Sequence, residues 1–75
     1  MQRYAAVSGD AGVVGYEILE DAVILEFRDG SQYLYSYARP GMEHVEQMKV
    51  LAAAGKGLTT YVNQHIREDY DKRLK

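Results

Sequence analysis

Three short segments of the chain are rich in β-branched, aromatic and aliphatic residues and are separated by turn residues, at positions 13–19, 22–28 and 31–37. Glu20-Asp21 is short enough for a two-residue hairpin loop, and Asp29-Gly30 is a strong hairpin signal. The pattern predicts a three-stranded antiparallel meander. Residues 1–12 show no sustained period, so we expect them to be largely coil, with or without a short extended piece at residues 4–7.

Helical spacing replaces the strand pattern after residue 39. Pro40 is predicted to begin a first helix, since the first helical position needs no backbone N–H donor, and Gly55 is a natural C-cap. The apolar positions between them are Met42, Val45, Met48, Leu51 and Ala52.

A second helix is predicted beyond a flexible corner at residues 55–57. Thr59 or Thr60 can cap it, and Val62, Ile66 and Tyr70 fall at four-residue steps on one face. Its end is expected to carry interleaved charges on a solvated face: Arg67, Glu68, Asp69, Asp71, Lys72, Arg73 and Lys75. The order is βββαα, which predicts an α+β domain with both helices packed on one face of the sheet.

The register of the second hairpin decides where the tyrosines of residues 33–37 point, because a one-residue slip inverts a strand. A two-residue loop at 29–30 would leave a large aromatic patch on the face without helices. A three-residue loop at 28–30, with Gly30 in the left-handed conformation, places Tyr33 opposite Leu25 and Tyr35 opposite Val23. Since each buried tyrosine withdraws about 150–250 Å² from water, we predict the second arrangement, with Tyr33 and Tyr35 mostly buried against the helices.

The same register separates the side chains of the sheet into an apolar and a polar face, as expected when one face packs on a core. The first hairpin then pairs Ile18 with Val23, Tyr16 with Leu25 and Val14 with Phe27. The apolar face comprises Val14, Tyr16, Ile18, Val23, Leu25, Phe27, Tyr33 and Tyr35. The opposite face comprises Gly15, Glu17, Ile24, Glu26, Arg28, Gln32, Leu34 and Ser36.

Composition narrows the class of protein. The chain has 75 residues, 47% of them hydrophobic and 27% charged, which indicates one ordinary globular domain spanning residues 1–75. It has no cysteine, which excludes disulfides and thiolate metal sites. Without an apolar signal-peptide region or a run of membrane-spanning length, we expect a cytoplasmic protein that does not enter the membrane. The formal net charge of −2 does not favour nucleic-acid binding.

Several residues resemble a known family in their order and spacing. They are Val14-Gly15-Tyr16, Val23, Leu25, Phe27, Gly30, the central Tyr33-Leu34-Tyr35, Pro40 and the closing stretch from Tyr61 to Arg67. Together they resemble the KTSC family, named for the C-terminal domain of some lysyl-tRNA synthetases and including short stand-alone bacterial and phage proteins. The resemblance implies a small α+β fold and no established activity. It also implies RNA binding by association with the synthetase, which is an analogy between proteins rather than a mechanism.

No arrangement of residues indicates catalysis. The stretch 55–60 resembles a phosphate-binding loop, but its lysine is followed by glycine and it follows a helix, so we interpret it as a corner between helices. His44 and His65 with Asp69 are too few ligands for a metal site, and Glu43 and Glu46 are expected on an exposed helix face. Ser31 and Ser36, like Ser8, are expected on turns or the strand surface. The sequence therefore predicts a non-catalytic module without cofactor or metal.

Two functions remain open. The first is protein binding or self-association through the edge strand 31–37 and the apolar pair Ile24 and Leu34 beside Glu17. Alternatively that edge is covered by residues 3–8, and the pair are tolerated surface residues. The second function is RNA binding by an accessory domain, for which the candidate residues are Tyr37, Arg39, Lys56 and Arg67.

Overall fold

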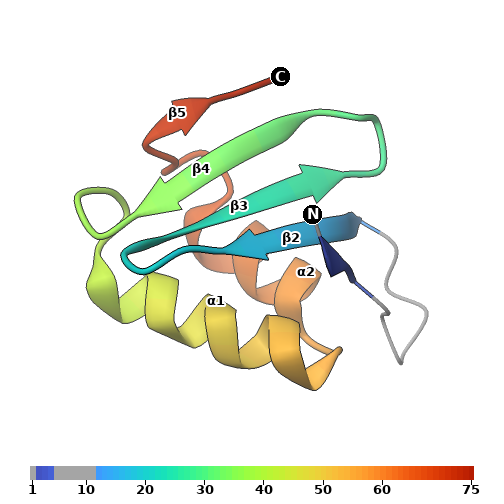
Figure 1. Ribbon diagram of the computed structural model, residues 1–75, viewed down its shortest axis with the longest axis horizontal. Helices are drawn as coiled ribbons and strands as arrows, with labels where there is room; N and C mark the ends of the chain where they lie inside the picture. The colour runs from blue at the N-terminus through green and yellow to red at the C-terminus, as the bar shows by residue number, and fades with distance from the viewer. Residues whose placement is uncertain (1, 5–11) are drawn as a thin grey trace.

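The computed structural model describes residues 2–4 and 12–75, and five antiparallel strands form its sheet in the order of the sequence (Figure 1). The strands are β1 (Gln2–Arg3), β2 (Val13–Ile18), β3 (Ala22–Phe27), β4 (Gln32–Ser36) and β5 (Lys72–Arg73). The helical segments are α1 (Met42–Ala54), α2 (Leu58–Tyr61) and a π-helical turn, η1 (Val62–Ile66). Figure 1 shows the helices beneath one face of the sheet, while no described element covers the other face, called the open face below.

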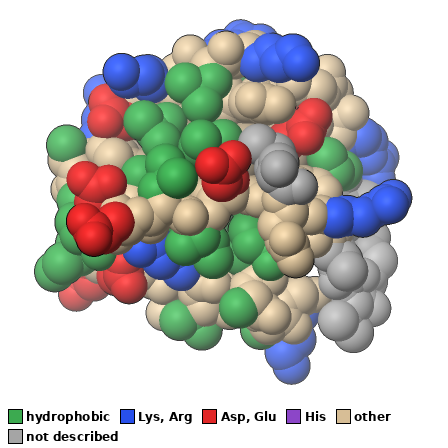
Figure 2. All heavy atoms as spheres, in the orientation of Figure 1, with side chains coloured by type: hydrophobic (Ala, Val, Ile, Leu, Met, Phe, Trp, Pro, Cys, Tyr) green, Lys and Arg blue, Asp and Glu red, His purple; other side chains and the backbone are tan. Residues whose placement is uncertain are grey.

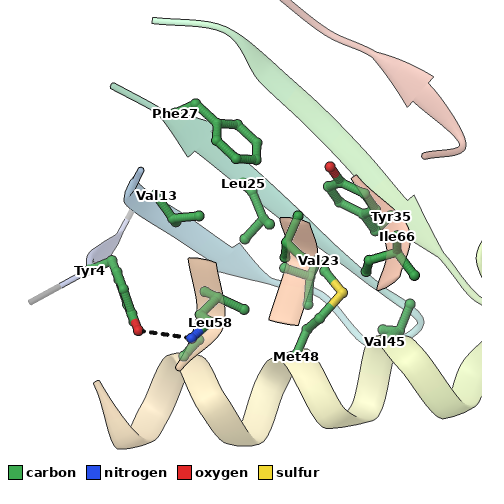
Figure 3. Close-up of a cluster of buried hydrophobic side chains, with 12 residues drawn as sticks. Tyr4, Val13, Val23, Leu25, Phe27, Tyr35, Val45, Met48, Leu58 and Ile66 are labelled. Carbon is green, nitrogen blue, oxygen red and sulfur yellow. Dashed lines mark hydrogen bonds between the residues drawn. The ribbon is translucent and has the colours of Figure 1, made fainter. Parts of the chain in front are cut away.

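The α+β class, the central meander and the position of the helices on one face are confirmed. The prediction of exactly three strands is wrong, because a short strand is added at each edge. The described residues bury one hydrophobic cluster between sheet and helices (Figure 3). Its members are Tyr4, Val13, Val23, Leu25, Phe27, Tyr35, Val45, Met48, Ala52, Leu58, Val62 and Ile66.

The second hairpin has the predicted three-residue loop. The Phe27 N–H donates to the Ser31 carbonyl at 2.9 Å, and Gly30 has a φ of 90°, which favours glycine. Leu25 therefore pairs with Tyr33 and Val23 with Tyr35.

Tyr35 is fully buried as predicted, and its hydroxyl donates to the Arg67 carbonyl at 3.2 Å. Tyr33 is only half-buried, so the prediction holds for it in part. Its ring lies 4.6 Å from that of Tyr70, with the Arg73 guanidinium 5.5 Å from its centre.

The first hairpin differs from the prediction at one end. Ile18 pairs with Val23 and Tyr16 with Leu25 as expected, but a bulge makes Val13, not Val14, the partner of Phe27. Val13 is therefore 1% exposed in the core, while Val14 is 38% exposed.

The first helix begins later than predicted, and the second helical segment begins and ends earlier than predicted. Gly41 precedes α1, and Pro40 lies in the preceding turn after a cis peptide bond, whereas Gly55 ends the helix in the left-handed conformation as predicted. Gly57, rather than Thr59 or Thr60, precedes α2. The charged residues 67–75 lie beyond the last helix. Lys72 and Arg73 form β5, because their backbone groups pair with those along the outer edge of β4.

The N-terminal segment forms hydrogen bonds with α2, which the sequence analysis did not predict. Tyr4 is buried, and its hydroxyl accepts a hydrogen bond from the Leu58 N–H at 3.2 Å (Figure 3). The Thr59 hydroxyl accepts a buried hydrogen bond from the Val13 N–H at 3.0 Å. A Cβ at Gly12 would lie 2.5 Å from the Thr59 methyl group, so this approach requires glycine. Residues 5–7 of the expected extended piece lie outside the described residues.

Among the described residues, no helix is long and apolar enough to cross a membrane.

Replacing Thr59 by valine should lower the free energy of unfolding by about 1–3 kcal/mol, because the buried Val13 N–H loses its acceptor. Thr60→Val is the matched control, since Thr60 is the exposed neighbour, and it should change stability by less than about 0.5 kcal/mol. Urea unfolding of the three proteins measures both effects. Equal losses in the two variants would contradict the assigned role of Thr59.

Tyr35 should make stability depend on alkaline pH. Burial raises the pKa of the Tyr35 hydroxyl, so above about pH 10 the unfolded chain loses this proton before the folded protein does. The free energy of unfolding then falls by up to about 1.4 kcal/mol per pH unit. Urea unfolding at about pH 9 and pH 11 should show that the stability advantage of the wild type over Tyr35→Phe shrinks as pH rises. A constant difference would exclude this linkage.

Candidate functional site

A row of four side chains crosses the open face at the same level of four adjacent strands. Glu17 pairs with Ile24, Ile24 with Leu34, and Leu34 with Lys72. Cross-strand partners share a face and lie about 5 Å apart, so the four form one continuous row. We call it the open-face row: Glu17, Ile24, Leu34 and Lys72.

The open-face row is apolar in the middle and oppositely charged at its ends. Ile24 and Leu34 are half-buried, whereas Glu17 and Lys72 are exposed. Figure 2, drawn from the same side as Figure 1, shows hydrophobic side chains gathered over the middle of the sheet with acidic side chains beside them. The three residues predicted from the sequence as an interaction patch are thus neighbours, and β5 adds Lys72, which the prediction placed on a helix.

A second row runs parallel to the first, one pleat away. Gly15 pairs with Glu26, and Glu26 with Gln32. Beyond Gln32, the N–H of Leu74 donates to the Gln32 carbonyl at 2.8 Å, which places Leu74 next in this row. Leu74 is 45% exposed. We call this the second row: Gly15, Glu26, Gln32 and Leu74.

The predicted edge strand 31–37 is not an edge, and this part of the interaction hypothesis is wrong. Gln32 exchanges backbone hydrogen bonds with residues 74 and 75, and the Leu34 carbonyl accepts one from the Asp71 N–H at 2.7 Å. At the other end of β4, the Ser36 N–H donates to the Arg39 carbonyl at 2.8 Å. The outer edge of β4 is therefore paired along its length, and another strand cannot be added there without breaking these hydrogen bonds.

The Ser36 side chain connects the segments that pair with the outer edge of β4, although the sequence analysis predicted only a serine on a turn or strand surface. Its hydroxyl donates to Asp71 Oδ2 at 2.7 Å and accepts from the backbone N–H groups of Ala38 and Arg39, each at 3.2 Å. The hydroxyl thus links the approach to β5 with the turn before α1. Ser31, also buried, donates its hydroxyl and its backbone N–H to Asp29 Oδ1 at 2.6 and 3.0 Å, and these two hydrogen bonds lower the pKa of Asp29.

Tyr37 and Arg39, two of the four RNA candidates, are held by acidic partners. The Tyr37 hydroxyl donates to Glu46 Oε2 at 2.5 Å, which raises the pKa of Tyr37 and lowers that of Glu46. Arg39 forms an ion pair with Asp69 at 2.6 Å, which raises the pKa of the guanidinium. Neither side chain presents an uncompensated group to a phosphate.

The other two RNA candidates lie elsewhere. Arg67 stacks its guanidinium 4.8 Å from the centre of the Phe27 ring and donates to Asn63 Oδ1 at 2.9 Å. Lys56 is exposed in the corner after α1, at the opposite end of that helix from Arg39. A 13-residue helix spans about 20 Å, so Lys56 lies far from Tyr37 and Arg39.

The two histidines meet around a tyrosine that the sequence analysis did not single out. His44 Nδ1 lies 2.6 Å from the Tyr61 hydroxyl, and the His65 ring lies 4.8 Å from that of Tyr61. Burial and the nearby Glu43 raise the pKa of Tyr61. Among the described residues, no three His, Asp or Glu side chains are grouped to hold a metal ion.

Two hollows in the described surface bear on the site. One depression of about 450 Å³ is lined by Gln2, Tyr16, Glu17 and Ile18, and it borders the open-face row at Glu17. A second, of about 270 Å³, is lined by Gly12, Phe27, Arg28, Asp29 and Arg67. Both are wide open to solvent and lack the enclosing apolar walls typical of small-molecule sites.

No family model, no curated protein and no solved structure matches the chain.

RNA binding should be weak. The net charge is −2, and Tyr37, Arg39 and Arg67 are engaged in contacts within the protein. We expect fluorescence anisotropy titrations with single-stranded and hairpin RNA at low salt to give no dissociation constant below about 0.1 mM, the weak end of non-specific binding. Tighter binding that Lys56→Ala or Arg67→Ala weakens would restore the RNA hypothesis.

Proposed function

We propose that this protein is a non-catalytic protein-binding module that uses the open face as its binding surface. The observation that carries the proposal is the open-face row, with two adjacent aliphatic side chains between an acidic and a basic end. An antiparallel sheet with one face on a core usually presents polar residues on the other, so a central aliphatic pair is unusual there. A surface with an apolar centre and a charged rim is typical of protein interfaces.

The arrangement of backbone groups supports a face rather than an edge as the binding surface. The outer edge of β4 is paired along its length, and the edge strands β1 and β5 have two residues each. An added strand would gain few hydrogen bonds at either edge. Side-chain contacts across the open face therefore supply the affinity in this proposal.

The proposal includes membership of the KTSC family and a cytoplasmic location. The resemblance in sequence supports the first, together with the core positions of its residues Tyr35 and Ile66. The lack of cysteine is compatible with the second.

Changing the centre of the open face should weaken binding at least about tenfold. Immobilised wild type, Leu34→Glu and Val50→Glu are compared as baits in lysate of the source cells by quantitative mass spectrometry. Val50 is the matched control, because it is 61% exposed on α1, away from the open face. At least one protein, counting further copies of this chain, should be retained at least about tenfold less by Leu34→Glu than by the other two.

The purified partner must then bind the wild type and the Val50 variant with equal affinity in calorimetry, and the Leu34 variant at least about tenfold more weakly. Circular dichroism shows that all three baits are folded. If every retained protein binds the three baits equally, the open face is not the binding surface and the proposal fails.

A further inference from the structure

We propose that the partner of the open face is a second copy of this chain, and that two copies pack face to face about a two-fold axis parallel to the strands between β3 and β4. The inference rests on the proposed function and names the partner. Rotation about this axis places β2 over β5 of the second copy and β3 over β4. The complementarity of the two rows across this axis carries the inference.

The open-face row is complementary to itself under this rotation. Ile24 faces Leu34 of the second copy, and Glu17 faces Lys72 of the second copy; each contact occurs twice by symmetry. The aliphatic pairs stack at the centre, and the two ion pairs close the rim. Sheets pack face to face with strands rotated by about 30°, a shift at the rim that the long Glu17 and Lys72 side chains can follow.

The second row is complementary in the same register. Glu26 faces Gln32 of the second copy, so that the amide N–H can donate to the carboxylate. Gly15, which is buried, faces the exposed Leu74 of the second copy and contributes no side chain to this contact. The same axis therefore matches charge in the open-face row and hydrogen bonding in the second row.

A two-fold axis perpendicular to the strands is disfavoured by charge. It would place Glu17 over Glu17 and Lys72 over Lys72 of the second copy along the same row. Like charges in contact repel each other, and the repulsion is stronger at a partly desolvated surface than in water. The pattern of charges thus selects the orientation of the dimer as well as its surface.

The area of the open face determines how tightly we expect the two copies to bind. Four strands about 4.8 Å apart and five residues long, at about 3.3 Å each, give a footprint of roughly 19 by 17 Å. This is smaller than the roughly 800 Å² per partner of a standard interface, so the dimer belongs to the weak, reversible class. We expect a dissociation constant on the order of 100 µM.

Analytical ultracentrifugation of the purified chain from about 10 µM to about 1 mM tests the proposal. The average mass should rise from the 8.5 kDa of the monomer towards twice that value. Leu34→Glu should remain monomeric, and Val50→Glu should behave as the wild type. A wild type that stays monomeric at about 1 mM would overturn the inference, as would self-association unaffected by Leu34→Glu.

Charge reversal tests the axis. Glu17→Lys and Lys72→Glu each replace two attractive contacts by two repulsive ones, so each should weaken dimerisation about tenfold. The double variant, or an equimolar mixture of the two single variants, should restore it; the double variant also shows that the substitutions permit folding. Single variants that dimerise as well as the wild type would exclude this orientation.

Failure of the inference is distinguishable from failure of the proposed function. A monomeric wild type that still binds a foreign protein through Leu34 refutes the homodimer and leaves the binding module standing. A wild type that binds neither itself nor another protein through Leu34 refutes both.

Discussion

The pairing of Phe27 with Ser31 across the second hairpin determines what each face of the sheet contains. Because side chains alternate along a strand, this one register sends Val23, Leu25 and Tyr35 to the helices and Ile24 and Leu34 to the open face. A shift of one residue would exchange the two sets. The left-handed conformation of Gly30 makes this register accessible, and burial of Tyr35 stabilises it.

Closure of β4 by the C-terminal segment is the second constraint. An open strand beside exposed aliphatic side chains would invite irregular aggregation. Ser36, Asp71 and the short β5 pair that strand and leave the face as the accessible surface. The same pairing brings Lys72 to the end of the open-face row. The C-terminal segment therefore covers the outer edge of β4 and also supplies the basic end of that row.

Electrostatic contacts explain why the basic residues do not act as one surface. Arg39 is neutralised by Asp69, while Lys49 contacts both Glu46 and the Glu20 carbonyl, each at 2.9 Å. The Lys49 contact with Glu20 joins α1 to the first hairpin, and the Arg39–Asp69 pair joins the turn after β4 to the segment before β5. Surface pairs of this kind contribute little stability, and their main effect is to cancel the local charge.

Much of the architecture could be predicted because short-range rules govern it. The alternation of residues 22–28, the turn at Gly30 and the cap at Gly55 depend on neighbours in the sequence, and so the meander, the loop length and the end of α1 were predictable. Glu17, Ile24 and Leu34 could be placed together for the same reason, since cross-strand pairing follows from the two hairpins.

The predictions that were wrong depend on contacts between distant segments. Residues 67–73 were expected to continue a helix, because alternating charges are typical of one, but the unpaired groups of β4 offered them hydrogen bonds that no local pattern reveals. The roles of Tyr4, Thr59 and Ser36 likewise come from partners far away in the chain. Apart from the bulge at Val13 and Val14, the sequence by itself determined the faces of the meander, because side-chain alternation is local. Only the tertiary structure decided what closes the sheet and which charge ends the open-face row, because those depend on which distant backbone groups meet.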